Sequence, residues 1–387
     1  MVQLDVSKIV LLELIKKSQF GGAIEFPIEN FDWDAVYSEA QNQTVLGIIA
    51  PEVPVVVRES DEKWQRIQDQ LFAFNLRYFY AENELTKLLD DADIPFVILK
   101  GISAAIYYIH PDRRSMGDID FIVPQDYFEK TKKLLVDNQY VLEKQHTYKR
   151  HIGYIKNGIS FELHHHYSHD GFDIEDYLIE GIKNRVNEKI DYIEFSMLPK
   201  LSNGLLLLDH LRHHLRSGLG LRQVIDWMMY VYRNLDDSFW NTEFEHVAQE
   251  KGLVTFAKTV TRMCQIYFGL PNTFTWCMDA DVAVCDLLLE SLFISGNFGR
   301  KNGQGRSIEM ASVNIKKRGL FNYLQLAGEH NWKAYHKHHY LKPFCWFYQI
   351  FHLVWQGIKT GRNRKQLRND FERSHDRYEL LKKLDIN

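Results

Sequence analysis

The sequence predicts an α/β (α+β) fold, with a small mixed sheet flanked by helices and followed by a helical domain. Two short apolar, β-branched runs, at 96–99 and 119–123, are separated by helical segments, which is typical of an α/β core. Residues 140–167 contain extended runs joined by Asn157-Gly158, a turn pair that favours a β-hairpin. From about Asp173 onward the apolar spacing becomes mainly helical.

The N-terminal part, residues 1–90, is predicted to be a helical segment that packs on the core. Apolar residues recur at helical spacing over 4–17 and 32–42, and the stretch 61–89 is a long helix with one apolar stripe. Acidic residues interrupt the apolar stretch of the first segment, and no basic leader or cleavage site accompanies it. We therefore expect an amphipathic helix there rather than a targeting signal.

The core is predicted over residues 91–170. An acidic turn and Pro95 end the long helix, and the strand 96–99 runs into Gly101, which opens a new helix. After a polar loop the second strand follows, then a helix over 125–138 that Pro124 begins. The hairpin strands of 140–167 are expected in the same sheet.

Two further regions complete the predicted organisation. Residues 171–298 form a helical domain that closes a cleft against the sheet, with a glycine-rich break, SGLGL, between two helices. Residues 299–387 form a basic, aromatic-rich helical region, which the glycine-rich stretch GRKNGQGRS (299–307) joins as a mobile loop. The length of 387 residues agrees with two or three domains.

Charge is distributed unevenly along a chain whose formal net charge is only −4. Residues 300–387 hold 18 Lys and Arg against 7 Asp and Glu, whereas residues 1–299 hold 29 against 44. The overall balance excludes a uniformly basic nucleic-acid coat, and no specific DNA binding is predicted. Four cysteines at irregular spacing favour a reducing, cytoplasmic location, and no apolar run is long enough to predict a transmembrane span.

The chemistry is concentrated at Gly117-Asp118-Ile119-Asp120. On a strand Asp118 and Asp120 point to one face while the residues between and after them point to the core. Two adjacent carboxylates repel each other unless a cation lies between them, and hard oxygen ligands on a rigid strand suit Mg²⁺. The alternative is a solvated strand end with two surface acids.

Two flanking motifs favour the metal interpretation. Lys100-Gly101 lies at a strand-to-helix junction, where backbone N–H groups and the helix dipole favour a phosphate. Glu162 and His164 share one face of the strand SFELH, and a third carboxylate there would complete a two-metal site. Taken alone, Lys100-Gly101 is an ordinary helix start with an exposed lysine.

Together these strings resemble a known family. LKG, then Arg-x-x-x-Asp-Ile-Asp followed by two hydrophobic residues and Val, then acid-Leu-His, is similar to the bacterial proteins of the uncharacterised nucleotidyltransferase family. That family belongs to the polymerase-beta-type nucleotidyltransferase superfamily. The resemblance extends to LLLLDHLRHHLRSGLGLRQVIDW and covers about residues 70–235.

The resemblance implies roles for residues at matching positions. Asp118, Asp120 and Glu162 would be the metal-binding and catalytic acids, and they would hold two Mg²⁺ ions. Nucleotide contacts would come from Lys100, Gly101, Ser103, Arg114, His164, His210, His214, Arg222 and Asp226. The chain departs from active members of the superfamily at Gly101-Ile102, where they usually carry Gly-Ser or Gly-Gly; Ser103, displaced by two positions, is the nearest substitute.

Structural explanations compete for several of these residues. Of the histidines in His164-His165-His166, only His164 and His166 share a strand face, and a structural or substrate-facing role is favoured over zinc. His210 and His214 share a helix face and could bind a cation, or could be polar lining at a domain interface. Asp226 could be a buried acid paired with Arg222 four residues earlier.

The stretch 340–358 is rich in aromatic residues, contains one lysine and no acid, and precedes the basic run KTGRNRKQLR. It predicts a core helix, a helix on an anionic membrane surface, or a segment that holds RNA by stacking and phosphate contacts. The partners expected are therefore a nucleoside triphosphate, an unidentified acceptor, and a weak membrane or polyanion contact.

The sequence thus predicts a Mg²⁺-dependent nucleotidyltransferase that moves a nucleoside monophosphate from an NTP to a hydroxyl or phosphate acceptor. The departure at Gly101-Ile102 motivates a second hypothesis, a catalytically inactive binding module for a nucleotide, a peptide or a partner protein.

Overall fold

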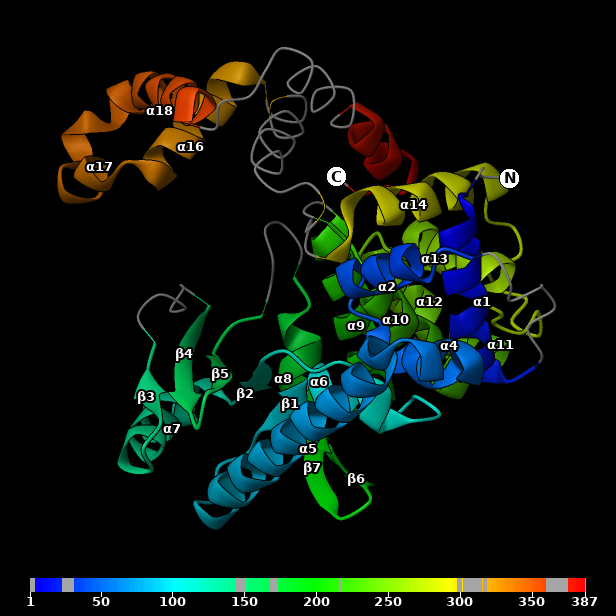
Figure 1. The fold of residues 1–387 in the computed structure, drawn as a ribbon. Helices are drawn as coiled ribbons and strands as arrows, with labels where there is room; N and C mark the ends of the chain where they lie inside the picture. The colour runs from blue at the N-terminus through cyan, green and yellow to red at the C-terminus, as the bar shows by residue number, and fades with distance from the viewer. Residues whose placement is uncertain are drawn as a thin grey trace.

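A mixed β-sheet with helices packed around it confirms the predicted α/β class (Figure 1). The structure is a computed structural model and describes residues 4–22, 31–143, 150–167, 173–215, 218–297, 301, 315, 319–359 and 375–386. The loop predicted over 299–307 lies outside these residues except for Lys301, and so does nearly all of the basic run 359–368.

Seven strands form the sheet in the order β3-β4-β5-β2-β1-β7-β6. Their bounds are β1 Val97–Leu99, β2 Ile119–Ile122, β3 Val141–Leu142, β4 His151–Lys156, β5 Ile159–His164, β6 Val186–Ile190 and β7 Ile193–Met197. β2 runs parallel to β5 and antiparallel to β1, which in turn runs parallel to β7. The remaining neighbours are antiparallel.

The predicted strands form because their apolar residues reach the core. Ile119 and Phe121 of β2 are fully buried, and so is nearly all of Phe161 in β5. β4 and β5 are joined by Asn157-Gly158, whose φ angles of 53° and 74° are those of the expected hairpin turn. Burial alternates over residues 159–163 of β5, and the polar side chains of Ser160 and Glu162 therefore lie on the opposite face of the sheet from Phe161.

β6 and β7 extend the sheet into the stretch that the sequence pattern assigned to helices. β6 is exposed at every residue but its last, so it carries no apolar alternation that distinguishes it from a loop. The predicted division into four regions remains a prediction.

The helices at the N-terminal side follow the expected periodicity. The long α5 spans Glu62–Asp91, begins at the Asp61 carboxylate, which accepts a hydrogen bond from the Lys63 backbone, and packs against β7 (Figure 1). The other helices and helical turns before β6 are α1 Val6–Phe20, α2 Trp33–Asn42, α3 Leu46–Ile49, η1 Ala50–Glu52, α4 Val55–Ser60, α6 Gly101–Ala105, η2 Pro111–Arg113, α7 Gln125–Asp137 and α8 Glu175–Lys183.

A second group of helices follows the sheet. α9 and α10, which are the two helices predicted around the glycine-rich break, contact each other and carry the second wall of the cleft. The group comprises α9 Lys200–Leu215, α10 Leu221–Asn234, α11 Asp237–Phe239, η4 Trp240–Phe244, α12 Glu245–Glu250, α13 Val254–Tyr267 and α14 Val282–Ser295, and a helix over 375–383 ends the described chain.

The helices α16 (Leu320–Asn331), α17 (Lys333–Lys337) and α18 (Cys345–Lys359), with the short turn η7 (His339–Phe344), pack on one another apart from the sheet (Figure 1). We call this group the C-terminal hairpin. Among the described residues, no helix has both the length and the apolar character needed to cross a membrane.

Candidate active site

Two carboxylates lie at the start of β2, on the face turned away from the core. Asp118 is exposed, whereas Asp120 is only 3% exposed. The negative charge of the neighbouring Asp120 carboxylate raises the pKa of Asp118. The two acids therefore repel each other and favour a cation between them.

Asp120 itself is strongly held in its ionised form. Burial alone would raise its pKa, but the Lys100 ammonium and the hydrogen bond from His164 outweigh burial and hold the pKa of Asp120 well below its usual range. The Lys100 Nζ atom lies 3.0 Å from Asp120 Oδ2, and His164 Nε2 lies 2.8 Å from Asp120 Oδ1. Both contacts are buried, so the ionised form of each group is stabilised by its partner rather than by water.

β5 supplies the third acid. The parallel register sets Glu162 opposite Asp120, so both carboxylates project from the same face of the sheet. Oxygen atoms of Asp118, Asp120 and Glu162 all lie within 4.8 Å of one another. Three carboxylates this close, all offering hard oxygen ligands, fit a Mg²⁺ ion that completes its shell with water or phosphate oxygens.

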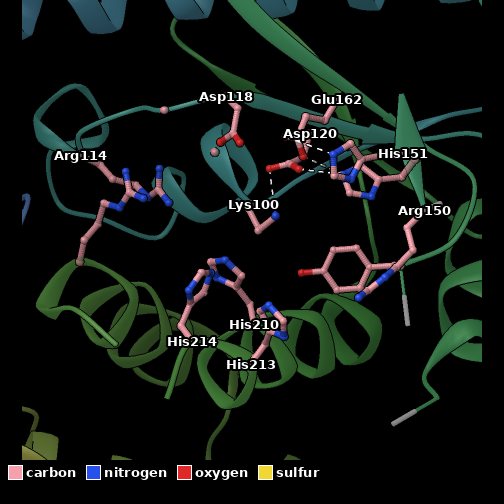
Figure 2. Close-up of a pocket in the computed structure, with 15 residues that line it drawn as sticks. Lys100, Arg114, Asp118, Asp120, Arg150, His151, Glu162, His210, His213 and His214 are labelled. Carbon is pink, nitrogen blue, oxygen red and sulfur yellow. Dashed lines mark hydrogen bonds and ion pairs between the residues drawn. The ribbon is translucent and has the colours of Figure 1, made fainter. Parts of the chain in front are cut away.

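The carboxylates line a cleft of about 350 Å³ between the sheet and α9. Figure 2 shows Asp118 and Asp120 on the sheet side, with the imidazoles of His210, His213 and His214 facing them from the helix. The cleft is lined by Lys100, Gly101, Arg114, Gly117, Asp118, Asp120, Arg150, His151, Glu162, His164, Tyr167, His210, His213, His214 and Arg222. The sheet wall thus carries the three carboxylates among basic and imidazole groups, and α9 and α10 supply only imidazole and guanidinium groups to this lining.

The Lys100-Gly101 turn has a geometry that differs from the expected phosphate-binding helix start. Both residues have positive φ, at 54° and 44°, and a Cβ on Gly101 would lie 3.2 Å from Glu82 Oε1. The following helix, α6, has only five residues, so its dipole is too short to add much to anion binding. Lys100 is directed to Asp120 instead (Figure 2).

Ser103 and Asp226 do not line the cleft. Ser103 is fully buried and donates a hydrogen bond to the Lys100 carbonyl at 2.7 Å. Ile102 is also fully buried, so neither residue after Gly101 presents a hydroxyl to the cleft.

Asp226 is a buried acid, as the structural explanation expected, but it forms a two-pronged pair with Arg114. Arg114 Nε and Nη2 donate to its two oxygens at 2.7 and 2.8 Å, and the Tyr108 hydroxyl donates at 2.7 Å. Arg222 instead donates to the Ser115 carbonyl at 3.0 Å. Arg114 borders the cleft, yet its guanidinium is committed to Asp226 and ties the loop before β2 to α10.

Four cleft residues were missed by the sequence reasoning: Arg150, His151, Tyr167 and His213. His151 of β4 pairs across the strands with His164, and their rings are 4.9 Å apart. The two-residue hairpin turn fixes that register, so the sequence did contain a signal for His151.

The chain is similar to a known protein family and, in structure, to a nucleotidyltransferase-like protein. The family described as uncharacterised nucleotidyltransferase matches residues 29–269, and the chain belongs to this family. An antigenic nucleotidyltransferase-like protein from Paracoccidioides brasiliensis is similar in structure over 46% of this chain and 90% of its own, with 12% sequence identity and a TM-score of 0.30. No curated protein matches the chain.

Proposed function

We propose that the chain catalyses Mg²⁺-dependent transfer of a nucleoside monophosphate from an NTP to a hydroxyl or phosphate acceptor. The acceptor oxygen would bond to the α-phosphorus, the bond from that phosphorus to the bridging oxygen would break, and pyrophosphate would leave. The observation that carries this proposal is the cluster of Asp118, Asp120 and Glu162 in the cleft of a nucleotidyltransferase-family chain.

The residues of the cleft have distinct parts in this proposal. Asp118, Asp120 and Glu162 would hold two Mg²⁺ ions, which neutralise phosphate charge and lower the pKa of a bound hydroxyl. Glu162 would accept the proton that a hydroxyl acceptor loses. The phosphate oxygens would be bound from the opposite wall by Arg222, His210 and His214, because these three side chains line the same cleft as the carboxylates.

Pyrophosphate release from a panel of NTPs tests the proposal. The wild-type protein should release pyrophosphate only with a divalent ion, and Asp118→Asn with Asp120→Asn should abolish the release. Asp176→Asn, an exposed acid on α8, is the matched control and should keep full turnover. Unchanged turnover in the double variant would overturn the proposal.

The alternative function is an inactive binding module. It is supported by the burial of Ile102 and Ser103, because neither residue after Gly101 presents a hydroxyl to the cleft. Thermal-shift measurements separate the two functions. Stabilisation by NTP that requires Mg²⁺, together with pyrophosphate release, supports catalysis. Stabilisation by NTP without any release in the presence of Mg²⁺ or Mn²⁺ supports the binding module.

We also propose that the C-terminal hairpin rests on an anionic membrane surface. Phe347, Phe351 and Trp355 are 62%, 70% and 54% exposed along one side of α18, while Cys345 and Gln349 are buried toward α16. This aromatic side does not fit the core-helix interpretation. The run 359–368 that follows holds five basic residues and no acid, which complements anionic lipid.

Co-sedimentation with phosphatidylserine-containing vesicles at two salt concentrations tests this contact. The full chain should sediment at low salt, and Phe347→Ser with Phe351→Ser should leave it in the supernatant. Phe72→Ser, which changes a 54% exposed ring on α5, is the control. Loss of vesicle binding in the control as well, or binding to RNA but not to vesicles, would contradict a membrane surface.

A further inference from the structure

A second group of metal-ligating side chains adjoins the three carboxylates. His151, Glu162 and His164 each offer a ligand atom within 4.8 Å of the others. They come from β4 and β5, where His151 lies opposite His164 and Gly153 lies opposite Glu162. Gly153 has no side chain, so the β4 side chain that lies beside Glu162 is the His151 imidazole.

The distances between these atoms suit ligands of one ion. His151 Nε2 and His164 Nε2 each lie 3.5 Å from a different oxygen of Glu162, and His164 Nε2 lies 2.8 Å from Asp120 Oδ1. Two ligands about 2.1 Å from a metal are about 3.0 Å apart at a right angle and about 3.4 Å apart at a tetrahedral angle. His151, Glu162 and His164 therefore need little movement to close around a cation, and Asp120 already contacts His164.

The donor atoms differ from those of the neighbouring position. Asp118, Asp120 and Glu162 offer only oxygen, which suits Mg²⁺. Two imidazoles with carboxylates suit late first-row metals, which bind nitrogen far better than Mg²⁺ does. The side chains of His151 and His164 are 16% and 7% exposed, so a bound ion would be shielded from water on the side of the sheet.

We propose that His151, Glu162 and His164, with Asp120 as a fourth ligand, form a binding position for a transition-metal cation of the Zn²⁺ class. This inference rests on the proposed function in one respect, because the ion would share Asp120 and Glu162 with Mg²⁺. The two metal positions of the cleft would then be chemically different. Such an ion is a stronger Lewis acid than Mg²⁺ and would lower the pKa of a coordinated hydroxyl further.

Cobalt absorption tests the position without any activity measurement. Metal-free full-length protein is titrated with Co²⁺, whose visible bands report coordination by nitrogen. One equivalent should bind, equimolar Zn²⁺ should displace it, and a large excess of Mg²⁺ should not. Displacement of Co²⁺ by Mg²⁺ at similar concentration would overturn the proposal.

Variants assign the ligands. His151→Ala and His164→Ala should each weaken Co²⁺ binding at least about tenfold. Loss of a residue that only orients a ligand already weakens metal binding about 10- to 100-fold, and loss of a ligand itself should cost at least as much. His166→Ala, which removes a 63% exposed ring just beyond β5, should leave the titration unchanged. His151→Asn serves if the alanine variant does not fold, as judged by circular dichroism. Unchanged binding in either ligand variant, or loss in His214→Ala instead, would overturn the assignment.

Failure of this inference is distinguishable from failure of the proposed function. Asp118→Asn should lose Mg²⁺-dependent pyrophosphate release and keep Co²⁺ binding, because Asp118 belongs only to the all-oxygen group. A wild-type protein that binds Co²⁺ through His151 yet releases no pyrophosphate would retain the metal position and reject the transferase.

Discussion

Lys100 and Asp120 form a buried ion pair at the sheet side of the cleft, with 3.0 Å between Nζ and Oδ2. The side chains are 16% and 4% exposed, and the Asp120 charge raises the pKa of Lys100 despite the burial that opposes it. The lysine thus neutralises one of the three carboxylates to which a metal ion would bind.

Replacing Lys100 with Met should strengthen the binding of Mn²⁺ to the NTP-free protein, because a competing positive charge is removed. Two unit charges about 4 Å apart interact with an energy of about 1 kcal/mol in water and about 4 kcal/mol at an effective dielectric constant of 20. Removing the repulsion between the lysine and the metal ion should therefore tighten Mn²⁺ binding at least about fivefold. Electron paramagnetic resonance of free Mn²⁺ measures it. Lys132→Met on α7 is the control, and weaker Mn²⁺ binding in Lys100→Met would show that the lysine organises the carboxylates instead.

The Arg114–Asp226 pair should act mainly on stability. Both side chains are almost fully buried, so Arg114→Ala leaves a buried carboxylate without its cation and should lower the free energy of unfolding by about 3–5 kcal/mol. Urea denaturation measures the loss. Arg66→Ala breaks an exposed pair with Glu62 on α5 and should cost less than about 1 kcal/mol. Equal losses in the two variants would refute the structural role of Arg114.

Glu82 should make stability depend on pH. Burial raises its pKa from 4.5 to about 8, so the folded chain keeps a proton that the unfolded chain has lost between these values. The folded state binds more protons in this window, and stability falls as pH rises through it. The Tm of Glu82→Gln should therefore fall less between about pH 5 and pH 8 than that of the wild type. Glu180→Gln on α8 should follow the wild type, and parallel curves for Glu82→Gln would contradict a neutral Glu82.

Gly101 should not tolerate a side chain. Gly101→Ala places a Cβ 3.2 Å from Glu82 Oε1 at a φ of 44°, and should lower the free energy of unfolding by more than the roughly 1–2 kcal/mol of backbone strain alone. Gly252→Ala supplies the comparison, since its φ is 63° and nothing lies within 4 Å of its Cβ. If both variants lose the same stability in urea, the contact with Glu82 carries no weight.

Local patterns predicted the parts of the site that lie on strands with buried neighbours. Ile119 and Phe121 are buried, so alternation alone placed Asp118 and Asp120 on the opposite face. The turn Asn157-Gly158 also determines that His151 is the β4 residue beside His164, so the sequence contains the signal for this cleft residue.

What could not be predicted depends on contacts distant in sequence or on exposed elements. Arg114 and Asp226 are 112 residues apart, so local spacing offered only Arg222 as the acid's partner. β6 is an exposed edge strand with no apolar alternation. The direction of the Lys100 side chain depends on the positive φ angles of both Lys100 and Gly101. Glycine adopts a positive φ readily, but nothing in the sequence predicts that the lysine does so too.

A crystal structure of the protein soaked with a non-hydrolysable NTP and Mn²⁺, with anomalous data collected for manganese, tests the central claim most directly. The account predicts an anomalous peak within coordination distance of Asp118, Asp120 and Glu162, with the triphosphate between this peak and the α9 wall. A triphosphate bound elsewhere, or the absence of a peak at these carboxylates at saturating Mn²⁺, would contradict the account.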